Sequence, residues 1–166
     1  MTVLSFPMDT FDELSSHLET PEQVAFMLAH EESQGIFRVN AIRTYETGGS
    51  EYRTNQEYED VIRPEVIGWA WETGGCLIEA HSHGKWFSPV AFSPFDLEQL
   101  DEWVPHVRWR LEGRPYFAIV TAGDEVDGLA WLDNENPTRI GKLIIDGSPD
   151  LQTTGVSAAR LRRYEE

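Results

Sequence analysis

Two histidines and an aspartate within a short stretch are the side chains best suited to do chemistry in this sequence. His81 and His83 follow the apolar run Cys76-Leu77-Ile78, which comes directly after two glycines and predicts a β-strand. In a strand, residues i and i+2 point to the same face, so the two imidazoles project side by side and can bind one metal ion.

Asp96 can supply a third ligand, because Ser93-Pro94-Phe95-Asp96 begins a new helix shortly after the histidines. Two histidines and one carboxylate with an open fourth position are typical of a catalytic zinc site. Each half also has a simpler interpretation. A His-x-His on a strand is weak evidence alone, and Ser93 and Asp96 fit an N-cap and a capping-box acid without any chemistry. Their occurrence together on consecutive elements favours the metal site.

The combined pattern resembles that of the JAMM (JAB/MPN/Mov34) metalloprotease family, over about residues 20–145. That family has an upstream Glu-x-x-Gly, then His-x-His-Pro, about seven residues, and Ser-x-x-Asp. Here Glu32-Ser33-Gln34-Gly35 matches the upstream element, with Glu31 as a competing candidate. The chain departs from the family in two places: Gly84 replaces the proline, and nine residues separate His83 from Ser93.

The resemblance implies a fold and a set of roles. The expected fold class is α/β, a mixed central β-sheet flanked by helices, in the JAMM/MPN, cytidine-deaminase-like architecture. His81, His83 and Asp96 would bind Zn²⁺, and a water would complete the tetrahedron. Glu32 would act as the general base, and the Ser93 hydroxyl would hydrogen-bond the developing oxyanion.

The resemblance also implies an activity and partners. We expect a zinc-dependent, deubiquitinase-like isopeptidase that processes the C-terminus of a ubiquitin-like protein, in a bacterial antiviral conjugation system with E1-like and E2-like enzymes. The substrate tail is expected to add as a strand beside the metal. The alternatives are trimming of a sulfur-carrier or phage-tail protein, and a catalytically silent scaffold.

Composition limits the other possibilities. The chain has 166 residues, which fits one domain, and a formal net charge of −16, which argues against nucleic acid as a partner. Its single cysteine, Cys76, excludes an intrachain disulfide and is expected to be a buried apolar residue. The sequence contains no apolar run long enough for a membrane span and no secretion signal, so a cytoplasmic location is expected.

Periodicity and turn residues predict the remaining elements. A helix over 21–33 is expected to begin at Thr20-Pro21 and to place Glu32 at its end. The segment 47–60 is expected to be an exposed loop, either a plain one or a flap over the substrate. Trp86 and Phe87 could be core aromatics or could line a substrate groove. Other strands are expected at 2–6, 36–45, 76–83, 116–121, 126–132 and 139–145, and helices at 9–18, from Arg63 to Gly74, and from Ser93 to about 112.

Overall fold

The computed structural model describes residues 1–46, 61–133 and 136–165. The predicted loop at 47–60 therefore lies outside the described residues. The strands are β1 (Thr2–Phe6), β2 (Val24–Ser33), β3 (Ile36–Tyr45), β4 (Cys76–Ser82), β5 (Tyr116–Ala122), β6 (Glu125–Trp131), β7 (Thr138–Ile145) and β8 (Leu151–Gln152). The helices are α1 (Met8–Leu18), α2 (Arg63–Thr73), α3 (Pro94–Arg110) and α4 (Val156–Glu165).

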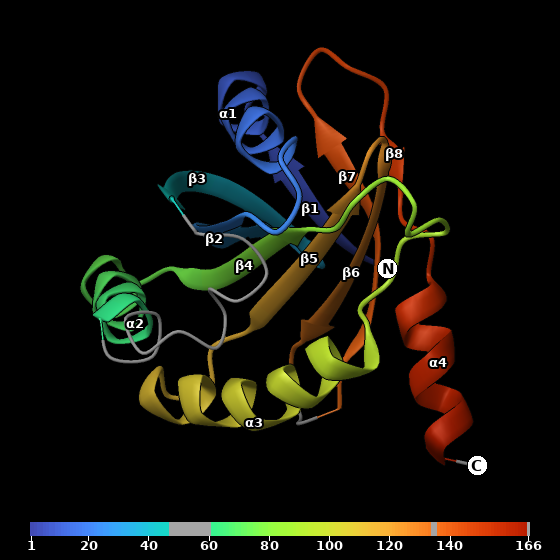
Figure 1. Cartoon of the computed structure of the whole chain (residues 1–166). Helices are drawn as coiled ribbons and strands as arrows, with labels where there is room; N and C mark the ends of the chain where they lie inside the picture. Colours follow the sequence, from blue (N-terminus) through green and yellow to red (C-terminus); the bar gives the residue numbers. More distant parts are fainter. Residues whose placement is uncertain (47–60, 134–135, 166) are drawn as a thin grey trace.

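Within these residues, seven strands close into a mixed β-barrel in the order β1-β3-β2-β4-β5-β6-β7 (Figure 1). The barrel closes because β1 pairs in parallel with both β3 and β7. The expectation of a helix-flanked central sheet of the JAMM/MPN type is therefore wrong. Sequence periodicity predicted most of the strands, but it carries no information on whether the first and last strands of a sheet meet.

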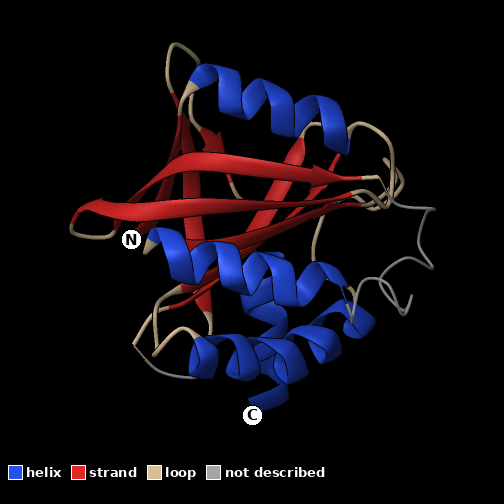
Figure 2. Cartoon of the chain, turned by 90° about the vertical axis from the view of Figure 1, so that its left-hand side faces the viewer, coloured by secondary structure: helices blue, strands red, loops and turns tan. Residues whose placement is uncertain are grey.

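The barrel has two hydrophobic cores, one on each face of its wall. The inner core receives side chains from β1 to β7 and is covered by Leu14 and Leu18 of α1. The outer core packs α2, α3 and Ala158 of α4 against β2, β4, β5 and β6. Helices accordingly lie on both sides of the strands (Figure 2). No helix of the described chain is both long and apolar enough to cross a membrane.

The predicted helix over 21–33 is also wrong, because Val24–Ser33 forms β2. Its first six residues are all buried: the side chains of Val24, Phe26 and Leu28 enter the outer core, and those between them enter the inner core. A strand covered on both faces shows no polar alternation. Its alanine, methionine and leucine residues are moreover good helix formers, so local propensity favoured the wrong element.

The strand that carries the histidines lies in the middle of the barrel wall. β4 pairs antiparallel with β2 on one side and parallel with β5 on the other. It therefore has no free edge to which a substrate peptide could add, and the expected strand addition beside the metal site does not fit this fold at β4. A peptide that reaches the histidines must bind through the surfaces around the end of β4.

Candidate metal centre

His81, His83 and Asp96 meet where β4 ends and α3 begins. Nε2 of His81 lies 3.3 Å from Nε2 of His83 and 3.3 Å from Oδ2 of Asp96. Nε2 of His83 lies 2.9 Å from the same Asp96 oxygen. The three residues are 2%, 8% and 4% exposed, respectively. The structure thus brings together the three metal ligands that the sequence predicted.

This group could hold a metal ion. Two donor atoms that each lie 2.0–2.1 Å from a tetrahedral zinc are about 3.3 Å apart, close to the separations observed here. Two imidazole nitrogens and one carboxylate oxygen form a donor set suited to zinc and to several other divalent metals. Among the described residues, this is the group of histidines, cysteines and acids whose ligand atoms converge in this way.

The start of α3 fixes the Asp96 carboxylate. Ser93 is the N-cap: its hydroxyl accepts a hydrogen bond from the Asp96 backbone N–H at 3.0 Å. Oδ2 of Asp96 in turn accepts one from the Ser93 backbone N–H at 2.9 Å, which completes a capping box. The acid of the capping box and the candidate metal ligand are thus the same side chain, that of Asp96. Ser93 lies beside the site, and its hydroxyl proton can still be donated to another acceptor.

The charges around His83 raise its pKa above the ordinary value. Burial lowers this pKa, but the hydrogen bond and the negative charge of Asp96, together with Glu22, outweigh the burial. These surroundings stabilise the imidazolium form of His83, relative to a histidine in water, when the site holds no cation. A metal cation bound by the same Nε2 must displace that proton.

Glu22 is the carboxylate that the structure adds to the site. Its Oε1 lies 3.4 Å from Nδ1 of His83, and its side chain is 28% exposed. The backbone at Glu22 has φ of 65°, a left-handed conformation that is uncommon outside glycine. Such backbone strain costs about 1–3 kcal/mol and is often found at functional sites.

Ser82, between the two histidines, holds the Glu22 segment in place. Its hydroxyl donates to the carbonyl of Thr20 at 2.7 Å and accepts from the backbone N–H of Gln23 at 3.1 Å. Its carbonyl accepts from the backbone N–H of Glu22 at 2.7 Å, and its own N–H donates to the carbonyl of Gln23. Ser82 is fully buried, so these bonds form without competition from water.

Glu32, the acid that the sequence pattern selected, is not brought to the site. It is exposed on β2 near the turn to β3, whereas Val24, at the other end of β2, is the residue that pairs with His81. Glu32 lies eight positions after Val24 along the strand, or about 26 Å at roughly 3.3 Å per residue. The incorrect prediction of a helix over 21–33 did not reveal that Glu32 and the site lie at opposite ends of one strand.

A signal for Glu22 was present in the sequence. Glu22-Gln23-Val24-Ala25 has the family's Glu-x-x-Gly spacing with alanine in place of glycine, and it directly precedes an apolar run. The Thr20-Pro21-Glu22-Gln23 stretch resembled a helix N-terminus instead. Interpreting the following apolar run as a strand would have placed Glu22 at its start.

Aromatic residues surround the site, one of them, Phe92, fully buried. The Phe87 ring stacks on His83 at 4.7 Å between centroids, and the Phe92 ring lies 5.6 Å from that of His81. Trp86 is 77% exposed and Phe87 41%, so neither is a core residue. The Trp86 ring lies against Gly84, where a β-carbon would collide with it. A larger residue at position 84 would require the Trp86 ring to move.

Contacts with the C-terminal part of the chain fix the longer loop between His83 and Ser93. The backbone N–H of Val90 donates to the Glu125 carboxylate at 3.1 Å, and that of Phe92 donates to the Ser157 hydroxyl at 2.9 Å. The hydroxyl of Thr154 donates to the Val90 carbonyl at 2.7 Å. These bonds fix the end of the loop, directly before Ser93.

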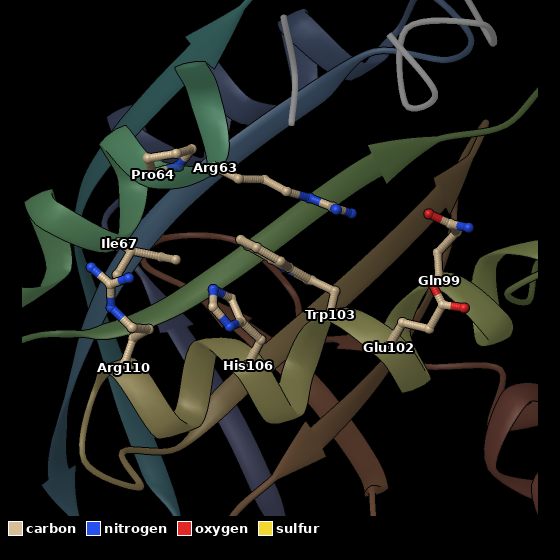
Figure 3. Close-up of a pocket in the computed structure, with 8 residues that line it drawn as sticks. All are labelled: Arg63, Pro64, Ile67, Gln99, Glu102, Trp103, His106 and Arg110. Atoms are coloured by element: carbon tan, nitrogen blue, oxygen red, sulfur yellow. The ribbon is translucent and has the colours of Figure 1, made fainter. Parts of the chain in front are cut away.

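Two other features are separate from the metal centre. Burial raises the pKa of the Cys76 thiol to about 11, so the thiol is protonated at neutral pH and is a poor nucleophile. A cavity of about 350 Å³ lies between α2 and α3, where the Arg63 guanidinium lies 4.2 Å above the Trp103 ring (Figure 3). His106 and Arg110 line the same cavity from α3.

Fold and site together define a closed mixed β-barrel with a buried group of two histidines and one aspartate at its rim. The solution structure of protein DSY2949 from Desulfitobacterium hafniense is similar, with a TM-score of 0.50 and 11% sequence identity. The match covers 87% of this chain and 94% of that chain. At this identity the likeness concerns the fold alone. No protein-family model and no curated protein matches the sequence.

Proposed function

We propose that this protein is a zinc-dependent peptidase that hydrolyses the peptide or isopeptide bond at the C-terminus of a ubiquitin-like protein. The observation that carries the proposal is the convergence of two Nε2 atoms and one carboxylate oxygen within 3.3 Å, with the Glu22 carboxylate next to His83. The substrate class follows from the resemblance of the His-x-His and Ser-x-x-Asp elements to the JAMM family. Chemistry of this kind depends on the site more than on the surrounding fold.

The positions of the side chains support a set of proposed roles. A zinc ion held by His81, His83 and Asp96 would supply an activated water and polarise the scissile carbonyl. Glu22 replaces Glu32 as the proposed base, which takes the proton of the water and delivers it to the leaving amine. The Ser93 hydroxyl donates a hydrogen bond to the developing oxyanion. Phe87 and Phe92 shield the histidines from bulk water.

The proposal is tested with a ubiquitin-like protein that carries a C-terminal extension, incubated with the zinc-loaded protein. Mass spectrometry locates the cut. We expect cleavage directly after the terminal residue of the ubiquitin-like domain, loss of cleavage with a chelator, and recovery when zinc is added. Cleavage that persists with a chelator contradicts the metal-dependent reaction. Cleavage at unrelated internal sites contradicts the substrate class.

A further inference from the structure

The mouth of the barrel contains a cavity of about 780 Å³ that borders the metal centre. Its lining includes residues of α1, of β5 and β6, and Leu143 of β7 and Leu151 of β8. Its walls are largely apolar and come from both α1 and the inner core, with Phe11, Leu14, Leu18, Ile119, Val126 and Leu143 among them. Barrel mouths with apolar walls and a few polar groups are common ligand sites.

His83 connects this cavity to the metal centre. The residue lines the cavity, and its Nε2 faces Asp96. The backbone N–H of His83 donates to the carbonyl of Thr121, another lining residue, at 2.7 Å, so the end of β4 is fixed against the cavity wall. A substrate whose carbonyl lies at the metal can therefore place a neighbouring side chain in the cavity.

The rim of the cavity is acidic. Glu19, Asp124 and Glu125 lie around it, against one lysine, Lys85. Glu125 also accepts the hydrogen bond from Val90, which fixes its carboxylate. The formal charge of these four rim residues is −2, and the chain as a whole carries −16. A ligand with a positive charge next to its apolar part complements this rim.

We propose that the barrel mouth is a specificity pocket that takes one large apolar side chain of an extended peptide, with a basic residue beside it at the acidic rim. As a part of substrate recognition, this inference rests on the proposed peptidase function. It also replaces strand addition at β4, which both neighbouring strands prevent. Selectivity then comes from the side chain in the pocket and not from backbone pairing.

Peptide binding to the metal-free protein tests the pocket separately from catalysis. The probes are acetyl-Gly-Leu-Lys-Gly-amide and two matched peptides, one with serine in place of leucine and one with glutamate in place of lysine. Amide chemical shifts are followed by NMR during titration. We expect shifts at Ile119, Val126 and Leu143, and an at least fivefold lower Kd for the leucine–lysine peptide than for either matched peptide.

Two tryptophan substitutions on α1 provide the structural control. Ser15 and Ser16 are both exposed on this helix, but only Ser15 lines the cavity. Ser15→Trp should abolish binding of the leucine–lysine peptide, whereas Ser16→Trp should leave it unchanged. Equal Kd values for the three peptides, or equal effects of the two substitutions, would overturn the proposal. So would tight binding of octanoate at this site with no binding of the peptides, which indicates a pocket for a small lipid.

Because no zinc and no turnover are needed, this result is independent of the peptidase proposal. If the protein binds the leucine–lysine peptide selectively but does not cleave a ubiquitin-like substrate, the pocket proposal stands and the proposed reaction is contradicted. If wild type and Ser15→Trp cleave the substrate equally well, the proposed reaction stands and the proposed pocket is contradicted.

Discussion

The Glu22 carboxylate lies 3.4 Å from Nδ1 of His83, although 61 positions separate the two residues. This contact permits two roles. Glu22 can orient the His83 ring and hold the proton on Nδ1, because metal-binding histidines usually donate a hydrogen bond from their second ring nitrogen to an oxygen. It can also act as the base that the hydrolysis requires. The two roles predict different effects of the same substitution.

Replacement of Glu22 by glutamine separates these roles. We expect Glu22→Gln to lower kcat by about 100-fold or more while zinc remains bound, because a general base is lost and a ligand is not. If Glu22 only orients His83, zinc affinity should instead fall by about 10- to 100-fold. Zinc titration and single-turnover assays measure both quantities. Glu32→Gln is the matched control and should behave as wild type in each.

Metal content tests the ligand set directly. Protein purified without added metal should contain about one zinc per chain, and His81→Ala and Asp96→Ala should each lose it. His30→Ala provides the control, because His30 is exposed on β2 and bonds Asn40. Zinc should also raise the Tm of the wild type, by an amount that corresponds to about 2.7 kcal/mol at a free concentration 100 times the Kd. Equal zinc in all four proteins would contradict the assignment.

Ser82 should affect catalysis through the position of Glu22. Ser82→Ala removes the hydroxyl bonds to Thr20 and Gln23, and it leaves the backbone bond to Glu22 intact. We expect lower kcat, nearly unchanged zinc affinity, and a loss of stability of about 1–3 kcal/mol, because buried polar groups lose their partner. A variant with normal kcat would show that these bonds serve stability alone. Denaturant unfolding and steady-state kinetics provide the two readouts.

The buried chain from Trp103 to Glu79 should stabilise the fold. The Tyr116 hydroxyl donates to Oε1 of Glu79 at 2.6 Å and accepts from the Trp103 indole at 2.8 Å. Tyr116→Phe should lower the free energy of unfolding by about 1–3 kcal/mol, since it withdraws a bond from a buried carboxylate. Adding Glu79→Gln should recover a part of this loss, because a neutral amide is less costly to bury. If the double variant is less stable than Tyr116→Phe, the explanation fails.

The ion pair between Arg38 and Asp146 should give a defined pH dependence. Two bonds, of 3.0 and 2.6 Å, join the guanidinium to the carboxylate, and this contact lowers the pKa of Asp146 below its ordinary value. Because the folded-state pKa is the lower one, the pair stabilises the fold above about pH 4 and ceases to do so as the pH falls through the folded-state pKa.

Asp146→Asn should therefore lower the Tm at pH 7, with a difference from wild type that shrinks as the pH approaches 3. Asp150→Asn gives the same change in charge at the Lys142 pair, which has a single bond of 2.9 Å. Calorimetric scans from pH 7 to pH 3 provide the measurement. A Tm difference for Asp146→Asn that stays constant over this range would contradict the role of the ion pair.

The sequence predicted that His81, His83 and Asp96 come together, because the signals for these residues are local. Strand parity aligned His81 with His83, and the helix cap at Ser93 placed Asp96 after the turn. Glu22 required the neighbour of β4 to be known, and that neighbour was taken for a helix. Residues 24–29 are apolar on both faces, so their sequence has no period that distinguishes the two structures.

Fold closure was beyond sequence reasoning for a similar reason. Most strand positions were predicted to within two residues, yet the barrel depends on β1 meeting β7. The sequences of the two strands do not indicate this pairing, because a buried strand has the same apolar residues in an open sheet as in a barrel. Trp86 shows a further limit: its exposure follows from the path of the loop and not from its residue type.

The position of β1 has a consequence for how the chain folds. β1 pairs with β7 between Thr2–Phe6 and Ile140–Ile145, so the barrel cannot close before β7 has been synthesised. At 5–20 residues per second, about 7–30 s pass between the two strands during translation. During that interval β1 can pair with β3, but the edge that pairs with β7 has no partner strand. Slow folding through non-local contacts follows from this arrangement.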